Sequence, residues 1–153
     1  MKAITIKQPW ATLIALGLKE FETRSWATKH RGPIAIHAGK SIDKEAFNEP
    51  TIYSALVKTG IESLIDLPTG AVIAIANLTE CHKITSDYYS MYEQESAGTD
   101  KGHLIEGDEW WFGNYEEGRY AWQLSDVQAI EPVLAKGQLS LWNWDEGSNR
   151  NDL

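Results

Sequence analysis

The run GAVIAIANL, from Gly70 to Leu78, constrains the fold of this 153-residue chain more than any other segment. It is apolar on both faces and rich in branched side chains, a pattern typical of a strand with apolar layers above and below it. A strand of this kind lies in the middle of a sheet. The sequence therefore predicts a sheet with residues 70–78 as its central, fully buried strand.

Weaker patterns predict the remaining elements. Residues 3–8 and 20–26 alternate apolar and polar side chains, as half-buried strands do. A helix is expected between them, with Pro9 at its first position and Gly17 at its end. The other expected elements are strands in PIAIHAG, YAWQLSDVQAIEPV and LSLWNW, a helical region from about Ser41 to Ile65, and a long loop with short helical turns over residues 85–118.

Strands outnumber helices in this pattern, and the helices lie in the connections. This predicts an α+β, mainly β fold: a small mixed β-barrel with helices packed outside it. A chain of this length with 42% hydrophobic residues suits one domain. We expect that domain to span residues 1–145, with a flexible tail at residues 146–153.

The composition argues against several classes of protein. No apolar run approaches the roughly 20 residues of a membrane span, and residues 1–25 lack a signal-peptide pattern, so we expect a soluble, cytoplasmic protein. The single cysteine, Cys81, cannot form an internal disulfide, and the four histidines lack the spacing of metal ligands. We therefore expect no metal and no cofactor. The sequence leaves the oligomeric state open.

Charge is distributed unevenly along the chain. The formal net charge is −8, yet residues 1–45 hold eight of the 14 basic side chains against four acidic ones. Non-specific coating of nucleic acid depends on many Lys and Arg contacts to phosphate, so the acidic total disfavours it. A basic first third on an acidic body suits a localised anionic ligand better.

The stretch GLKEFETRSW, from Gly17 to Trp26, gathers charge between two apolar elements. Strand alternation places Glu22 and Arg24 on one face, roughly 6.5 Å apart, and Lys19 can complete a triangle with them. Phe21 and Thr23 are expected to face the other way. The alternative is a solvated strand edge whose mixed charges only resist aggregation.

The segment ITIKQPWATLIALGLKEFETRSWATKHRGPIAIHAGK resembles the start of ASCH domains, which are related to the RNA-binding PUA domains. The family pattern G-x-K-x-x-E-x-R is present as Gly17, Lys19, Glu22 and Arg24. The later segments GAVIAIANLTECHKI, GNYEEGRYAWQL and KGQLSLW resemble the family's later strands. The resemblance implies a PUA-like barrel with these residues at the mouth of a cleft. It also implies binding of RNA or another nucleic acid, while some relatives are amidohydrolases of modified cytidine or ribonucleases.

In such a cleft each side chain has an expected role. Arg24 would donate to an anion or a base edge, Lys19 would be the titratable partner, and Glu22 would be an acceptor or general base. Trp10 could stack on a nucleobase, and Gln8 could contact a base edge. The remaining candidates, for phosphate contact, are Lys29, His30, Arg31, His37 and Lys40.

The chain departs from the pattern of the cytidine amidohydrolases. Those relatives have a threonine nucleophile at the position of Glu22, together with the lysine and a distant glutamate. Thr23 is expected on the opposite face, where it cannot substitute. The distant acid would be Glu93 or Glu95. Hydrolysis here would instead use Lys19 and Glu22 as catalytic residues, with the carboxylate activating water.

Three hypotheses follow. The first is a module that binds RNA or single-stranded nucleic acid in a basic cleft around Lys19, Glu22 and Arg24. The second is a hydrolase, of amidohydrolase or ribonuclease type, that acts on a modified nucleoside, a nucleotide or RNA at the same cleft. The third is a protein-interaction domain anchored by Trp26 or by the aromatic cluster EWWFGNY, although that cluster is expected to be mainly core.

Overall fold

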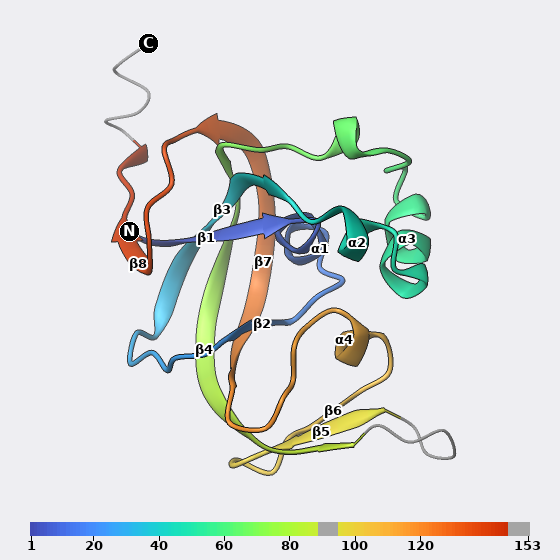
Figure 1. Ribbon diagram of the computed structural model, residues 1–153. Coiled ribbons are helices and arrows are strands. Elements are labelled where there is room, and N and C mark those ends of the chain that lie inside the picture. The colour runs from blue at the N-terminus through green and yellow to red at the C-terminus, as the bar shows by residue number, and fades with distance from the viewer. Residues whose placement is uncertain (89–94, 147–153) are drawn as a thin grey trace.

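The computed structural model describes residues 1–88 and 95–146 (Figure 1). The strands are β1 (Lys2–Gln8), β2 (Phe21–Arg24), β3 (Gly32–Ile42), β4 (Ala71–Tyr88), β5 (Ser96–Thr99), β6 (Leu104–Glu106), β7 (Tyr120–Leu134) and β8 (Leu141–Asn143). The helices are α1 (Trp10–Ala15), α2 (Lys44–Phe47), α3 (Pro50–Val57) and α4 (Asp108–Trp111), with a 3-10 turn, η1, at Leu64–Asp66. Most of the expected tail, residues 147–153, lies outside the described residues.

Strand β4 lies in the middle of the sheet, as the apolar run predicts. The order along the sheet is β2-β7-β4-β3-β1-β8, and β4 pairs antiparallel with β3 on one edge and β7 on the other. Strands β1 and β3 are parallel, whereas β8 pairs antiparallel with β1. The far end of β4 also pairs with β5, which pairs with β6.

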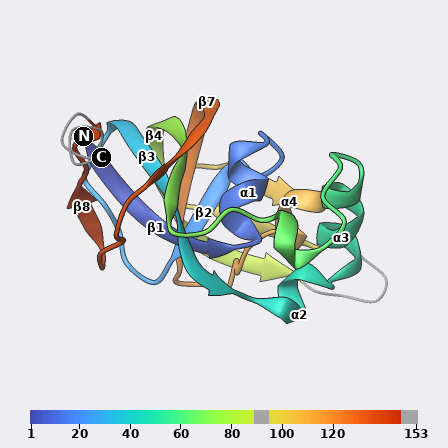
Figure 2. The same cartoon turned by 90° about the horizontal axis from the view of Figure 1, so that it is seen from above.

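The fold is mainly β with a few helices, which confirms the expected class. Closure into a barrel is not confirmed, because the strand pairs of the described residues form an open path with β2 at one end and β8 at the other. The helices gather at one side of the sheet, away from β8 and from the N-terminus (Figures 1 and 2). This arrangement brings α1, α3 and α4 to the side where β2 lies.

Apolar layers cover both faces of the central strands. On one face Ile73, Leu78 and Trp122 pack with isoleucines of β1 and β3 and with α1. On the other face Val72 packs with Trp142 and Trp144 near the C-terminal end. Burial on both faces of β4 thus explains why its sequence is apolar at nearly every position from Ala71 to Leu78.

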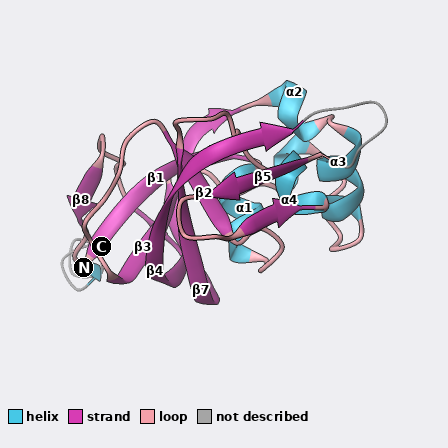
Figure 3. Ribbon diagram, turned by 90° about the horizontal axis from the view of Figure 1, so that it is seen from below, coloured by secondary structure: helices cyan, strands magenta, loops and turns pink. Residues whose placement is uncertain are grey.

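The prediction of a long loop with short helical turns over residues 85–118 is wrong in part. The first residues complete β4, and the rest include β5, β6 and α4 (Figure 3). Ala97 and Ile105, one from each short strand, are buried against Phe21 and Ile84. These strands were missed because each is very short and buries a single apolar side chain. Pro9 is the N-cap of α1, one position before the expected place, and Gly17 follows the helix with φ +76°.

Among the described residues, no helix combines the length and the apolar character that crossing a membrane requires.

The core position of β4 makes a stability prediction. Ile73 is 4% exposed, so Ile73→Ala should lower the free energy of unfolding by about 2 to 5 kcal/mol through lost burial and a residual cavity. Ile65→Ala is the matched control, because Ile65 is 91% exposed and its truncation should cost less than about 0.5 kcal/mol. Urea denaturation of the three proteins measures both effects. Equal losses in the two variants would contradict a central position for β4.

Candidate functional site

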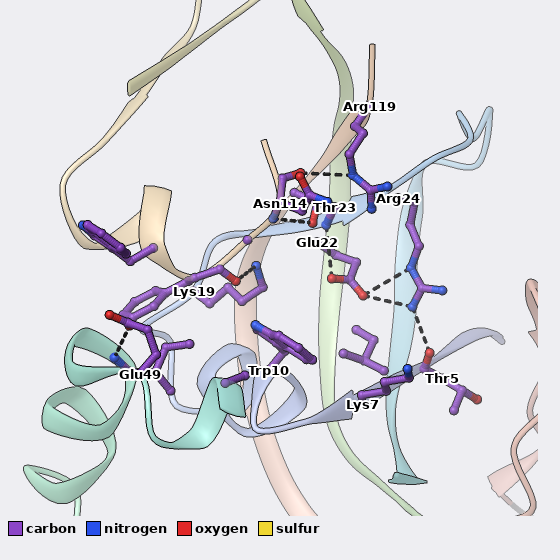
Figure 4. Close-up of a pocket in the computed structure, with 16 residues that line it drawn as sticks. Thr5, Lys7, Trp10, Lys19, Glu22, Thr23, Arg24, Glu49, Asn114 and Arg119 are labelled. Carbon is purple, nitrogen blue, oxygen red and sulfur yellow. Dashed lines mark hydrogen bonds and ion pairs between the residues drawn. The ribbon is translucent and has the colours of Figure 1, made fainter. Parts of the chain in front are cut away.

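One hollow of about 520 Å³ brings together residues from distant parts of the chain (Figure 4). We call it the cleft. It lies among the end of β1, the start of α1, β2, the start of α3 and the segment after α4. Its lining consists of Thr5, Ile6, Lys7, Trp10, Lys19, Glu22, Thr23, Arg24, Ala46, Glu49, Ile52, Trp111, Phe112, Gly113, Asn114 and Arg119.

Lys19 lies at the inner end of the cleft and is 1% exposed. The left-handed residue Gly17 ends α1 and turns the chain back, and the backbone N–H of Lys19 donates to Leu13 O at 3.1 Å. The Lys19 ammonium donates from Nζ to Phe112 O at 2.7 Å. Burial lowers the pKa of Lys19 below its ordinary value of 10.5, and the carboxylates of Glu22 and Glu109 oppose that change.

Glu22 and Arg24 face the same side of β2, as alternation predicts. Arg24 donates to Glu22 Oε2 from Nη2 at 2.9 Å and from Nε at 3.3 Å. The same Nη2 donates to Thr5 O of β1 at 2.9 Å (Figure 4). Glu22 is only 7% exposed, so this pair is not a solvated strand edge. The side chain of Arg24 connects two strands that do not pair with each other.

A further acid, Glu109, lies behind Lys19 at the start of α4. Its Oε1 accepts from the backbone N–H of Glu20 at 2.6 Å, and its Oε2 accepts from the Tyr115 hydroxyl at 3.1 Å. Burial raises the pKa of Glu109, while the positive charge of Lys19 lowers it. The sequence suggested Glu93 or Glu95 as the distant acid. Glu93 lies outside the described residues, and Glu95 does not line the cleft.

Tryptophans form two of the cleft walls. Trp10 is half-buried at the start of α1, and Trp111 is 37% exposed at the end of α4. The aromatic cluster was expected to be mainly core. Its residue Phe112 is buried, as that prediction requires, whereas Trp111 is exposed. The proposed anchor Trp26 is partly buried and packs edge-to-face on the core residue Trp122, with ring centroids 4.8 Å apart.

Thr23 also lines the cleft, which the alternation of β2 alone did not predict. The segment after α4 folds over β2, so Thr23 borders the cleft and its Oγ1 accepts from the backbone N–H of Asn114 at 3.2 Å. Arg119 also lines the cleft and donates from Nε to Asn114 O at 3.2 Å. The sequence alone did not indicate Asn114 or Arg119 as residues of the site. The phrase GNYEEGRY contained both, but local spacing did not place it beside β2.

The remaining candidate contacts do not join the cleft. Gln8 is fully buried, and its amide is bonded to Thr12 and Pro68, so it cannot reach a base edge. Lys29 and Arg31 lie outside the lining, and Arg31 donates to Glu80 at 2.8 Å. His30, His37 and Lys40 are also outside it, and the last two line a second hollow. Of the nine principal candidates, the cleft contains Trp10, Lys19, Glu22 and Arg24.

The charges and hydrogen bonds of the cleft suit an organic anion or a nucleobase. Four basic and two acidic side chains line it. In the part of the chain that the structure describes, Arg24 donates from Nε and Nη2, so its Nη1 group can donate to a ligand. No group of three His, Cys, Asp or Glu side chains in that part of the chain could hold a metal ion.

The fold and the cleft together define a small α+β domain with a ligand-sized cleft beside the edge strand β2. The chain belongs to the ASCH domain family, whose model matches residues 4–134. This match confirms the resemblance found in the sequence.

Two relatives and one solved structure agree with this assignment. The chain is 35% identical over 80 residues to activating signal cointegrator 1 of Homo sapiens and to that of Mus musculus. The match covers 51% of this chain and 14% of either relative, so this chain spans a small part of their length. The crystal structure of ASCH from Zymomonas mobilis superposes with a TM-score of 0.54 at 18% identity, over 99% of this chain and 94% of that one. At this identity the likeness concerns the fold alone.

The buried position of Lys19 predicts a pH effect on stability. The folded protein holds this amine at a lower pKa than the unfolded chain does, so the unfolded chain binds more protons between the two values. The contribution of Lys19 to stability therefore increases as the pH rises through the window below 10.5. Methionine has an apolar side chain of similar length that does not titrate. The increase in stability with pH that Lys19 contributes is therefore absent in Lys19→Met.

Urea denaturation of both proteins from about pH 7 to about pH 10 measures the difference, because other titrating groups cancel. The parent should gain stability relative to Lys19→Met as the pH rises. A difference that stays constant over this range would show that Lys19 titrates as a solvated amine.

Proposed function

We propose that this ASCH domain binds single-stranded nucleic acid, RNA in particular, by taking one nucleotide unit into the cleft. The observation that carries the proposal is the combination, in one hollow of about 520 Å³, of two tryptophan walls with the buried Lys19 and Glu22 and the half-buried Arg24. Pockets for small ligands span roughly 300–1,000 Å³, so this volume suits one base and its sugar and excludes a duplex.

The walls would hold the base by stacking. Every nucleobase offers a π-face, and stacking on an aromatic side chain contributes about 1–3 kcal/mol per base. Trp10 and Trp111 lie far apart in the sequence, so closing a base between them would also tie α1 to α4. Sequence preference would come from polar groups at the edge of the base.

Those polar groups lie on β2 and beside it. The free donors of Arg24 can bond to a carbonyl or ring nitrogen of the base, and Glu22 Oε1 can accept from an exocyclic amine. Glu22 and Lys19 are buried from solvent. A base whose edge does not complement them would therefore leave a buried polar group without a hydrogen-bond partner. The acidic remainder of the chain favours a ligand that touches the protein locally over a duplex lying across it.

A second candidate function is hydrolysis of a modified nucleoside or nucleotide in the same cleft. The observation that favours it is the lowered pKa of Lys19, because a neutral amine can accept a proton from attacking water. Glu22 would orient that water, and the Arg24 guanidinium would stabilise negative charge on the reacting carbonyl oxygen. Thr23 borders the cleft, but its hydroxyl accepts a bond from Asn114.

A ligand screen tests the proposal. Nucleosides, nucleotides and RNA or DNA oligomers are added in excess, and the melting temperature is recorded, since a ligand that binds only the folded state stabilises it. For the ligand found, Glu22→Gln should weaken binding by at least about tenfold, the equivalent of about 1.4 kcal/mol for one charge-assisted contact. The matched control is Glu80→Gln, which also breaks an Arg–Glu pair, at 2.8 Å, but outside the cleft.

The control should bind within about twofold of the parent. Equal affinity in Glu22→Gln and the parent would place the functional site elsewhere. The two candidate functions are separated by mass spectrometry of the mixtures. Product that appears with the parent and not with Lys19→Met supports hydrolysis, and an unchanged ligand supports binding alone.

A further inference from the structure

A second hollow, of about 950 Å³, lies on the other side of β1 from the cleft. We call it the second groove. The end of β3, the start of β4 and the segment between β7 and β8 enclose it. Its lining consists of Thr5, His37, Gly39, Lys40, Thr69, Gly70, Leu134, Ala135, Lys136, Gly137, Gln138 and Leu139.

The second groove is locally positive on an acidic protein. Its lining contains Lys40 and Lys136 and no aspartate or glutamate, although the whole chain carries a net charge of −8. In the described part of the chain, neither lysine forms an ion pair; those that occur involve Arg24, Arg31 and Lys101. Two unpaired cations with no carboxylate between them attract an anionic ligand.

The floor of the second groove is built by close packing. His37 is 2% exposed, and its Nε2 donates to Ala135 O at 2.7 Å, which holds the segment after β7 against β3. A Cβ on Gly137 would lie 2.8 Å from both His37 Cε1 and Thr5 Oγ1, so only glycine permits this approach. Burial lowers the pKa of His37, which keeps the ring neutral near pH 7. His37 is therefore a positioning residue for the segment, and the lysines carry the charge.

Thr5 joins the second groove to the cleft. Its carbonyl oxygen accepts from Arg24 in the cleft, and its Oγ1 accepts from Trp142 Nε1 at 3.1 Å on the other side. Among the described residues, β8 pairs with β1 only from Lys2 to Ile4, so no strand separates the two hollows at Thr5. Thr5 therefore borders both hollows.

We propose that the second groove binds the phosphate backbone of the nucleotides adjacent to the one held in the cleft. Lys40 and Lys136 contact the phosphates, and the exposed side chains of Leu134 and Leu139 flank the path, offering apolar contact to a sugar or base. This proposal rests on the proposed function, because it extends the same single strand. It assigns the cleft to one base and the second groove to sequence-independent affinity.

The test compares a nucleoside with an RNA octamer, both binding to the parent and to the double variant Lys40→Ala/Lys136→Ala. The variant should bind the octamer at least about tenfold more weakly and the nucleoside equally well. The dependence of log affinity on log salt should also fall by about 1.4, since each lost phosphate contact on a single strand contributes about 0.7. The matched control is Lys2→Ala/Lys58→Ala, two exposed lysines outside both hollows, which should change octamer binding less than about twofold.

The outcomes separate the two proposals. If the parent binds neither nucleoside nor octamer, the proposed function fails and the strand path fails with it. If the parent binds the octamer and the double variant binds it equally well, only the strand path is wrong. If the double variant loses affinity equally for the nucleoside and the octamer, the two lysines act on the ligand in the cleft, and the strand path is also wrong. If the double variant loses binding of an oligoglutamate peptide but binds the octamer as the parent does, the strand path is wrong and the second groove is a peptide site.

Discussion

The hydrogen bond from Arg24 to Thr5 O is the constraint on which the site depends. It connects β2 to β1 across a gap that no strand pairing of the described residues closes. Burying a guanidinium is costly unless a carboxylate compensates it, and Glu22 does so on the same face of β2. Lys19 acts similarly when it bonds to Phe112 O, 93 positions away along the chain. The charges that would contact a ligand therefore also hold the walls of the cleft together.

This double role changes what a variant in the cleft measures. The sequence predicts Glu22 and Arg24 on one face of a strand, Phe21 on the other, and Lys19 completing a charged triangle. The structure buries Lys19 almost completely, so Lys19→Ala would leave a cavity and an unpaired carbonyl on Phe112. Its removal would affect stability as well as binding. Lys19→Met and Glu22→Gln keep the side-chain volume and are the better probes.

Local sequence signals predicted the elements that have long, regular patterns. The apolar run of β4, the long strand β7 and the shared face of Glu22 and Arg24 all follow from periodicity. The burial of Lys19 could not be predicted, because it depends on a segment near Phe112 that packs over β2 from far along the chain. The separation of His37 and Lys40 from the cleft has the same cause, since the segment after β7 encloses them on the other side of β1.

The most direct test of the account is a crystal structure of this chain with a short single-stranded RNA. We predict that one base lies between Trp10 and Trp111, with its polar edge against Arg24 and Glu22. An RNA bound at the Lys29–Arg31 loop, with the cleft unoccupied, would contradict the assignment of the cleft as the functional site.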